Sequence, residues 1–208
     1  MNKINYHKLM IAEIESIKSK GQRPKLVLHS CCAPCSTHVL EVLNETFNLE
    51  ILFFNPNIYP KEEYHKRLQE QIHLIPKMEL DIKVAKTDYE SHLFYEKVKG
   101  LENLGEGSER CKQCISLRLE KTAMYAAENK FDYFTSTLSI SPLKNADIIN
   151  EIGQSLQDKY SVKFLIADFK KNNGFKNSID LSKKYNLYRQ DYCGCIFSKK
   201  ERESKNNK

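Results

Sequence analysis

The sequence predicts a single α/β domain in which a parallel sheet carries helices on both faces. Short runs of β-branched and aromatic residues alternate with longer stretches of helical periodicity, and such strand–helix–strand crossovers join parallel strands. The chain has 208 residues, enough for one hydrophobic core, and its content of 40% hydrophobic and 29% charged residues is typical of a globular protein. No internal repeat or low-complexity linker divides it.

The expected elements follow from this alternation. Five strands are predicted, at residues 25–28, 49–54, 81–85, 131–136 and 163–167. Four helices are predicted among them, near residues 36–44, 61–77, 109–129 and 143–159. A further helix is expected at the start of the chain, where an apolar face is formed by Leu9, Met10, Ile11, Ile14 and Ile17.

Three regions are expected along the chain: an amphipathic helix in 1–24, a catalytic α/β domain in 25–198 with a cysteine-rich C-terminal segment, and a charged, disordered tail in 199–208. The first region has acidic residues within its apolar pattern and no small-residue cleavage site, so it is not a signal peptide. No apolar run approaches the roughly 20 residues that span a bilayer. We therefore expect a cytoplasmic protein with no membrane partner. The net charge of +6 admits a polyanionic partner without requiring one.

Seven cysteines are concentrated in three short groups. The groups are Cys31, Cys32 and Cys35; Cys111 and Cys114; Cys193 and Cys195. A reducing compartment disfavours structural disulfides, which leaves metal binding or redox chemistry. Functional sites of open α/β sheets lie at the carboxyl ends of the strands, and the first group directly follows the first predicted strand of the sheet. The site is therefore expected at this edge.

The first two groups have the composition of a metal site. Cys111 and Cys114 are three residues apart, so both sulfurs face one side of a first helical turn, where the helix dipole favours thiolates. Together with Cys31 and Cys32 they provide four thiolates. Four thiolates satisfy an iron–sulfur cluster and also a structural zinc ion, and the spacing leaves both open.

The third group, Cys193-Gly194-Cys195, differs in character. A single intervening residue makes any disulfide strained, and strained disulfides are the labile, catalytic kind. Gly194 permits so tight a ring. The pair is therefore interpreted as a two-electron dithiol/disulfide switch, with metal binding as the alternative.

Several long motifs in one order resemble the cobalamin-independent epoxyqueuosine reductases of the QueH family. The motifs are LHSCCAPCS, NPNIYPKEEYHKR, ERCKQCISLRLEKTA, TSTLSISPLKN and FKKNNGFKNSIDLSKKYNLYRQDYCGCIFS. The resemblance covers about residues 26–198. Departures are small: Ser108 stands where a second glycine is common, and Ile115 where an aromatic residue is common.

The resemblance implies a Rossmann-like fold of the PP-loop or HUP-like type and reduction of epoxyqueuosine to queuosine at the tRNA wobble position. By matching position, a [4Fe–4S] cluster would be held by Cys31, Cys32, Cys111 and Cys114, and the redox-active disulfide would join Cys193 and Cys195. The implied partners are the tRNA anticodon stem-loop that carries epoxyqueuosine and an external electron donor, without cobalamin. The role of Cys35 stays open: a ligand of an additional iron, a replacement ligand or a substrate contact.

Other residues of the motif loops are candidates for supporting roles. The proton-donor candidates are His29, Asp88, Tyr89, Asp191 and Tyr192. The candidate tRNA contacts are Lys144, Lys170, Lys171, Lys176, Tyr188 and Arg189. Arg67 is expected either to pair with a carboxylate or to contact RNA.

Two other functions remain to be weighed. One is a PP-loop-type enzyme that thiolates tRNA, but such an enzyme needs ATP and a glycine-rich loop, and cysteines occupy that position here. The other is a zinc-stabilised RNA-binding module without catalysis. Metal content distinguishes such a zinc-stabilised module from an iron–sulfur protein.

Overall fold

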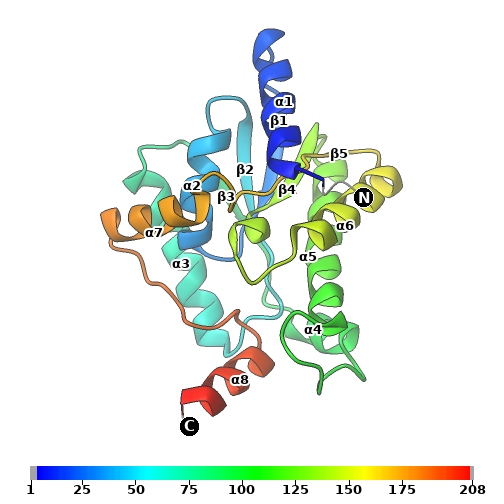
Figure 1. Cartoon of the computed structure of the whole chain (residues 1–208), viewed down its shortest axis with the longest axis vertical. Helices are drawn as coiled ribbons and strands as arrows, with labels where there is room; N and C mark the ends of the chain where they lie inside the picture. The colour runs from blue at the N-terminus through cyan, green and yellow to red at the C-terminus, as the bar shows by residue number, and fades with distance from the viewer. Residues whose placement is uncertain (1–3, 207–208) are drawn as a thin grey trace.

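The computed structural model describes residues 4–206 and contains one five-stranded parallel sheet with helices on both faces (Figure 1). The strands are β1 (Lys25–His29), β2 (Asn48–Phe53), β3 (Lys83–Lys86), β4 (Tyr133–Ser136) and β5 (Lys163–Phe164). Their order across the sheet is β3-β2-β1-β4-β5. This is the order of a Rossmann-like, doubly wound sheet, so the predicted fold class is confirmed.

The helices account for most of the remaining chain. They are α1 (Tyr6–Ser19), α2 (Ala33–Leu43), α3 (Lys61–Lys77), α4 (Ser91–Lys97), α5 (Glu109–Glu128), the 3-10 helix η1 (Thr137–Ile140), α6 (Ala146–Tyr160), α7 (Gly174–Lys184) and α8 (Ile196–Asn206). The predicted helix near 36–44 begins earlier, because Pro34 is well suited to a first helical turn. Among the described residues, no helix is both long enough and apolar enough to cross a membrane.

Alternate side chains of the strands point to two separate cores. Leu26 and Leu28 of β1 pack with the apolar faces of α1, α2 and α3. Val27, between them in the sequence, faces the opposite side and packs with α5 and α6. This period of two places helices on both faces, and it explains why β1, which pairs with β2 and β4, is buried on each side.

Both ends of the chain differ from the expected picture. The leading helix α1 is packed into the same core as β1 through Met10, Ile14 and Ile17. At the other end, residues 199–206 continue helix α8, where a disordered tail was expected. The buried Arg110 of α5 pairs with Glu201 at 2.9 Å, and this contact holds α8 against the domain. Residues 1–3 and 207–208 of the predicted end regions lie outside the described residues.

The packing of α6 on β5 leads to a prediction about Gly153. A Cβ at this position would stand 2.4 Å from the ring of the buried Phe164. Alanine favours a helix interior by about 1 kcal/mol over glycine, whereas overpacking a core costs roughly 1–3 kcal/mol. We expect the clash to dominate, so that Gly153→Ala lowers the free energy of unfolding measured by urea denaturation.

Gly105→Ala is the control, because nothing lies within 4 Å of a Cβ added at Gly105. A Gly153→Ala protein as stable as this control would contradict the packing described for α6 and β5.

Candidate functional site

The candidate site lies between the carboxyl ends of β1 and β4. β2 and β3 are added on one side of β1, and β4 and β5 on the other, so the connections leave these two strands in opposite directions. Ligands of doubly wound sheets bind at this switch point. Cys31 follows β1, and the segment 137–144 follows β4. Both segments line a cavity of about 370 Å³, within the size range of small-molecule sites. Residues 189–193 and α8 close its other side.

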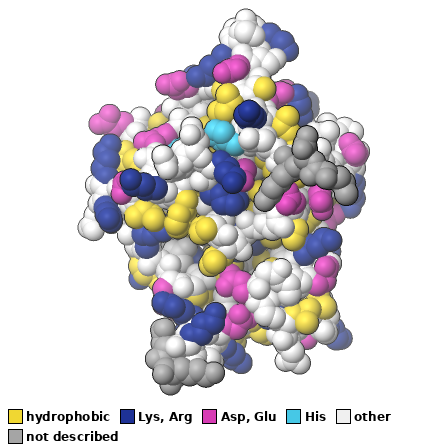
Figure 2. All heavy atoms as spheres, in the orientation of Figure 1, with side chains coloured by type: hydrophobic (Ala, Val, Ile, Leu, Met, Phe, Trp, Pro, Cys, Tyr) yellow, Lys and Arg dark blue, Asp and Glu magenta, His cyan; other side chains and the backbone are white. Residues whose placement is uncertain are grey.

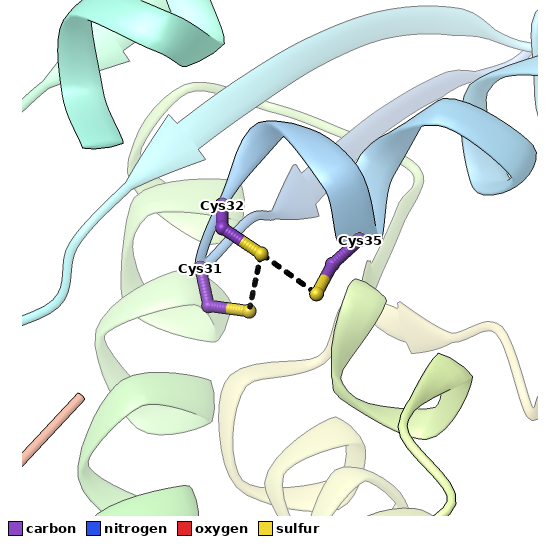
Figure 3. Close-up of side chains that lie close together, drawn as sticks. All are labelled: Cys31, Cys32 and Cys35. Carbon is purple, nitrogen blue, oxygen red and sulfur yellow. Dashed lines mark hydrogen bonds between the residues drawn. The ribbon is translucent and has the colours of Figure 1, made fainter. Parts of the chain in front are cut away.

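Three cysteines after β1 converge on one point (Figure 3). The Sγ atom of Cys32 lies 2.7 Å from that of Cys35 and 3.9 Å from that of Cys31. Within residues 4–206 these three form the one group of three or more potential metal-binding side chains whose ligand atoms lie within 4.8 Å of one another. Cys32 is the N-cap of α2 and Cys35 lies in its first turn, so the local fold itself gathers the sulfurs at a helix N-terminus.

The thiols of this cluster differ in their electrostatics. Hydrogen bonds from Cys32 and Cys35 hold the pKa of Cys31 well below its usual range. Burial raises the pKa of Cys32 to about 12. Hydrogen bonding with Cys31 and Cys32 raises the pKa of Cys35 as well. Among the three thiols, Cys31 is therefore the one that loses its proton most readily.

Cys111 and Cys114 face a second, smaller cavity at the start of α5. This cavity of about 20 Å³ is also lined by Cys193 and Cys195. The backbone N–H of Gly107 donates a hydrogen bond to Cys111 Sγ at 3.3 Å. Burial raises the pKa of Cys114 to about 11, against the opposing effect of the Arg118 guanidinium. The predicted ligands of α5 are thus next to the predicted dithiol.

Arg118 connects the two cysteine groups. Its side chain is buried, and its Nε donates to the carbonyl of Cys114 at 3.1 Å. Burial would lower its pKa, yet the surrounding thiols of Cys114, Cys193 and Cys31 raise it. Among the described residues no carboxylate pairs with it, and the ionisable groups that favour its charge are these cysteine thiols. The sequence prediction did not include Arg118, although its spacing of seven from Cys111 places both on one helix face.

The Cys193-Gly194-Cys195 segment is held in place by backbone contacts. The N–H of Tyr59 donates to Gly194 O at 2.8 Å, and Arg67 Nη1 donates to Cys193 O at 3.3 Å. Gly194 has a φ of +134°, which disfavours any side chain. Arg67 is buried and pairs with Glu63 at 2.7 Å, so a carboxylate is its partner.

The comparisons with known proteins are consistent with this site. The family model described as epoxyqueuosine reductase QueH matches residues 26–201. The epoxyqueuosine reductase QueH of Staphylococcus epidermidis is 45% identical over 202 residues, which cover 94% of this chain and 85% of that protein. The corresponding protein of Thermotoga maritima is 38% identical over 181 residues, covering 86% of this chain and 93% of its own length.

This chain belongs to the epoxyqueuosine reductase QueH family. The resemblance found in the sequence motifs is thereby confirmed, and with it the class of oxidoreductase. Among solved structures, the U34-tRNA thiolase NcsA from Methanococcus maripaludis with its [4Fe-4S] cluster has a TM-score of 0.49 at 14% identity, over 96% of this chain and 73% of that one.

The structure separates the proton-donor candidates of this QueH family member. His29 is fully buried, with Nδ1 2.8 Å from Ser136 Oγ and Nε2 3.2 Å from Phe54 O, and burial lowers its pKa to about 4. It therefore links three strands. Asp88 and Tyr89 line neither cavity, whereas Asp191 and Tyr192 line the larger one.

The expected tRNA contacts also differ in position. Lys171 and Lys176 are exposed, and Arg189 lines the larger cavity. Lys170 is engaged with Asp168 at 2.7 Å. Tyr188 is covered by Lys66, whose Nζ lies 3.4 Å from the ring centroid.

Lys144 has a different position from the one expected for an RNA contact. Its Nζ lies 3.1 Å from Cys193 Sγ, at the junction of the two cavities. Burial opposes the charge of Lys144, but the neighbouring Cys193 thiol raises its pKa.

The geometry of the Cys-Gly-Cys segment can be tested at Gly194. A Cβ there would stand 3.1 Å from Arg67 Nη1 and 3.3 Å from Ile58, in addition to the strain of a positive φ. We expect Gly194→Ala to cost about 1–3 kcal/mol of folding stability in urea denaturation.

Gly100→Ala separates the two causes, because Gly100 also has a positive φ, +82°, but nothing within 4 Å of an added Cβ. Equal losses of stability in the two variants would contradict the close packing of Gly194 against Arg67.

Proposed function

We propose that this chain reduces epoxyqueuosine in tRNA to queuosine. The reaction removes the epoxide oxygen as water and consumes two electrons and two protons. The observation that carries the proposal is a nucleoside-sized cavity at the switch point whose wall includes Cys31 on one side and Cys193 on the other. A base splayed out of the anticodon loop would enter it, which is the usual way proteins recognise single-stranded RNA.

We further propose that Cys31, Cys32, Cys111 and Cys114 hold a [4Fe–4S] cluster. Thiolates are the donors that such clusters require. The buried Arg118 supports this choice, because its guanidinium lies near thiols of the predicted ligands and would offset the negative charge of four thiolates. When bound, the cluster would supply one-electron transfer. Cys35 adds a fifth thiol beside Cys31 and Cys32, where it would be available to an additional iron. The proposed reaction uses no cobalamin.

The residues of the chain have distinct parts in this proposal. The dithiol of Cys193 and Cys195 supplies two electrons by closing to a disulfide, and an external donor resets it. Lys144 provides a positive charge beside Cys193 at the cavity wall. Asp191 and Tyr192 border the same space, where a proton must reach the departing oxygen.

The tRNA would be bound mainly around the cavity mouth. Arg189, Arg202 and Lys205 line this cavity and carry positive charge for phosphate contacts. Elsewhere positive and negative side chains are interspersed on the face drawn in Figure 2. The same cavity is also lined by Glu106, Asp191 and Glu201, so the proposed phosphate contacts are individual basic side chains and not a broad basic groove.

The alternatives of thiolation and zinc-stabilised RNA binding have less support. The turn after β1 presents Cys31 and Cys32 and no glycine-rich phosphate cradle, so ATP-dependent thiolation has no nucleotide site there. A zinc module would not require the Cys193 and Cys195 thiols in the same small cavity as Cys111 and Cys114.

The activity can be tested with tRNA that carries epoxyqueuosine. We expect anaerobically prepared protein with a chemical reductant to yield queuosine-tRNA without added cobalamin, measured by nucleoside mass spectrometry. Cys193→Ser should lower multiple turnover by roughly 100-fold, since the dithiol cannot form. A Cys193→Ser protein that retains its metal and turns over at the full rate would contradict the dithiol step.

The role of Arg118 can be tested by spectroelectrochemistry. Arg118→Met removes a positive charge beside the thiolates, so the midpoint potential of the bound metal centre should fall by tens of millivolts, while Arg118→Lys should retain it. Arg23→Met is the control, since Arg23 hydrogen-bonds to Asn44 O on the surface. An unchanged potential in Arg118→Met would show that the guanidinium does not act on the metal centre.

A further inference from the structure

The two sulfurs of the Cys-Gly-Cys segment are not equivalent. Cys193 is half-buried and lines both the larger and the smaller cavity. Cys195 is 7% exposed and lines only the smaller one. A molecule that enters the larger cavity from solvent therefore meets Cys193 first.

Cys193 has an ammonium group as a hydrogen-bonding partner. Lys144 Nζ approaches Cys193 Sγ to 3.1 Å from the loop between η1 and α6. The hydrogen-bonding partner of this ammonium group is a sulfur and not a carboxylate. An ammonium group beside a sulfur stabilises a thiolate, the form that attacks or is released in disulfide exchange.

Cys195 is the enclosed sulfur of the pair. Its Sγ accepts the N–H of Ser198 at 3.4 Å, and Ser198 Oγ lies at 3.4 Å. Cys195 directly precedes α8, and these contacts fix its sulfur at the start of that helix. The sulfur is therefore held close to Cys193 in the sequence but out of reach of solvent.

We propose that Cys193 is the sulfur that exchanges with an external dithiol, that Lys144 activates it, and that Cys195 is the buried resolving sulfur. The inference rests on the dithiol of the proposed function. In the resetting step a thiolate of the reductant attacks Cys193 Sγ, a new S–S bond forms, and the Cys193–Cys195 bond breaks with its electron pair on Cys195. The second thiol of the reductant then attacks the first sulfur of the reductant in the mixed disulfide, and this releases Cys193. The reductant leaves as a disulfide, having transferred two electrons, and the two released sulfurs take up its two protons.

The test is the rate of mixed-disulfide formation in variants of the metal-loaded protein that keep only one cysteine of the Cys193/Cys195 pair. Anaerobic Cys195→Ser and Cys193→Ser proteins are treated with limiting Ellman's reagent, and peptide mass spectrometry measures labelling of the remaining cysteine. Cys193 should react at least about tenfold faster than Cys195. Equal rates, or faster labelling of Cys195, would overturn the assignment.

Lys144 is tested in the Cys195→Ser background. Lys144→Met should slow the labelling of Cys193 by about tenfold, and Lys144→Arg should restore most of the rate, which loss of packing alone would not do. Lys159→Met is the control, because Lys159 is an exposed lysine at the far end of α6 that pairs with Glu120. An unchanged rate in Lys144→Met would refute the activating role.

This assay contains no tRNA and is independent of epoxide reduction. Preferential labelling of Cys193 in a protein that does not convert epoxyqueuosine-tRNA would support the exchange assignment and contradict the proposed function. Conversion of the tRNA by a protein with equal labelling rates would support the proposed function and contradict the exchange assignment.

Discussion

The organisation of the site depends on one buried cation, the guanidinium of Arg118. A buried charge is costly unless an opposite charge offsets it, and the groups around Arg118 are thiols of α5, of the β1–α2 turn and of the C-terminal segment. These segments are far apart in the sequence. Because negative charge on these sulfurs would stabilise the guanidinium, Arg118 ties the assembly of the fold to the chemistry of the cysteines.

The strand order makes this meeting possible. β1 lies beside β4, so the turn after β1 and the segment after β4 share one edge of the sheet. α5 packs across β1 on the opposite side from α2 and directs Cys111, Cys114 and Arg118 toward the same edge. Two further buried arginines then hold the C-terminal segment over it: Arg67 bonds the Cys193 carbonyl, and Arg110 bonds Glu201 of α8. The site is therefore enclosed by residues 189–193 and by α8.

Much of the fold was predictable because its signals are local. The helix at residues 61–77 was predicted with the bounds of α3, and the alternation of strands and helices predicted the parallel sheet. The last strand is shorter than predicted. Leu165 N–H still donates to Phe134 O of β4, but the backbone of Ala167 is bonded by the Asn150 side chain and not by β4. α7 and α8 were missed, because both are short, strongly charged segments whose helical form depends on tertiary contacts such as Arg110–Glu201.

The site was predictable only in part. The cysteine spacings and the family motifs indicated which sulfurs matter, because chemistry restricts these residue types. They could not indicate that Lys144 bonds Cys193 and that His29 spans three strands, because charge and residue type are the same in a surface contact and in a buried one. Partnering of this kind is a long-range property: Lys144 and Cys193 are 49 residues apart.

The most direct test of the account is the iron and acid-labile sulfide content of anaerobically purified protein, compared with a Cys111→Ser/Cys114→Ser variant. We predict about four iron atoms and about four sulfides per chain in the native sequence, and loss of both in the variant with its circular dichroism spectrum retained. A single zinc ion without sulfide in the native protein, or an undiminished iron content in the variant, would contradict the claim that thiolates from the β1–α2 turn and α5 share one iron–sulfur cluster.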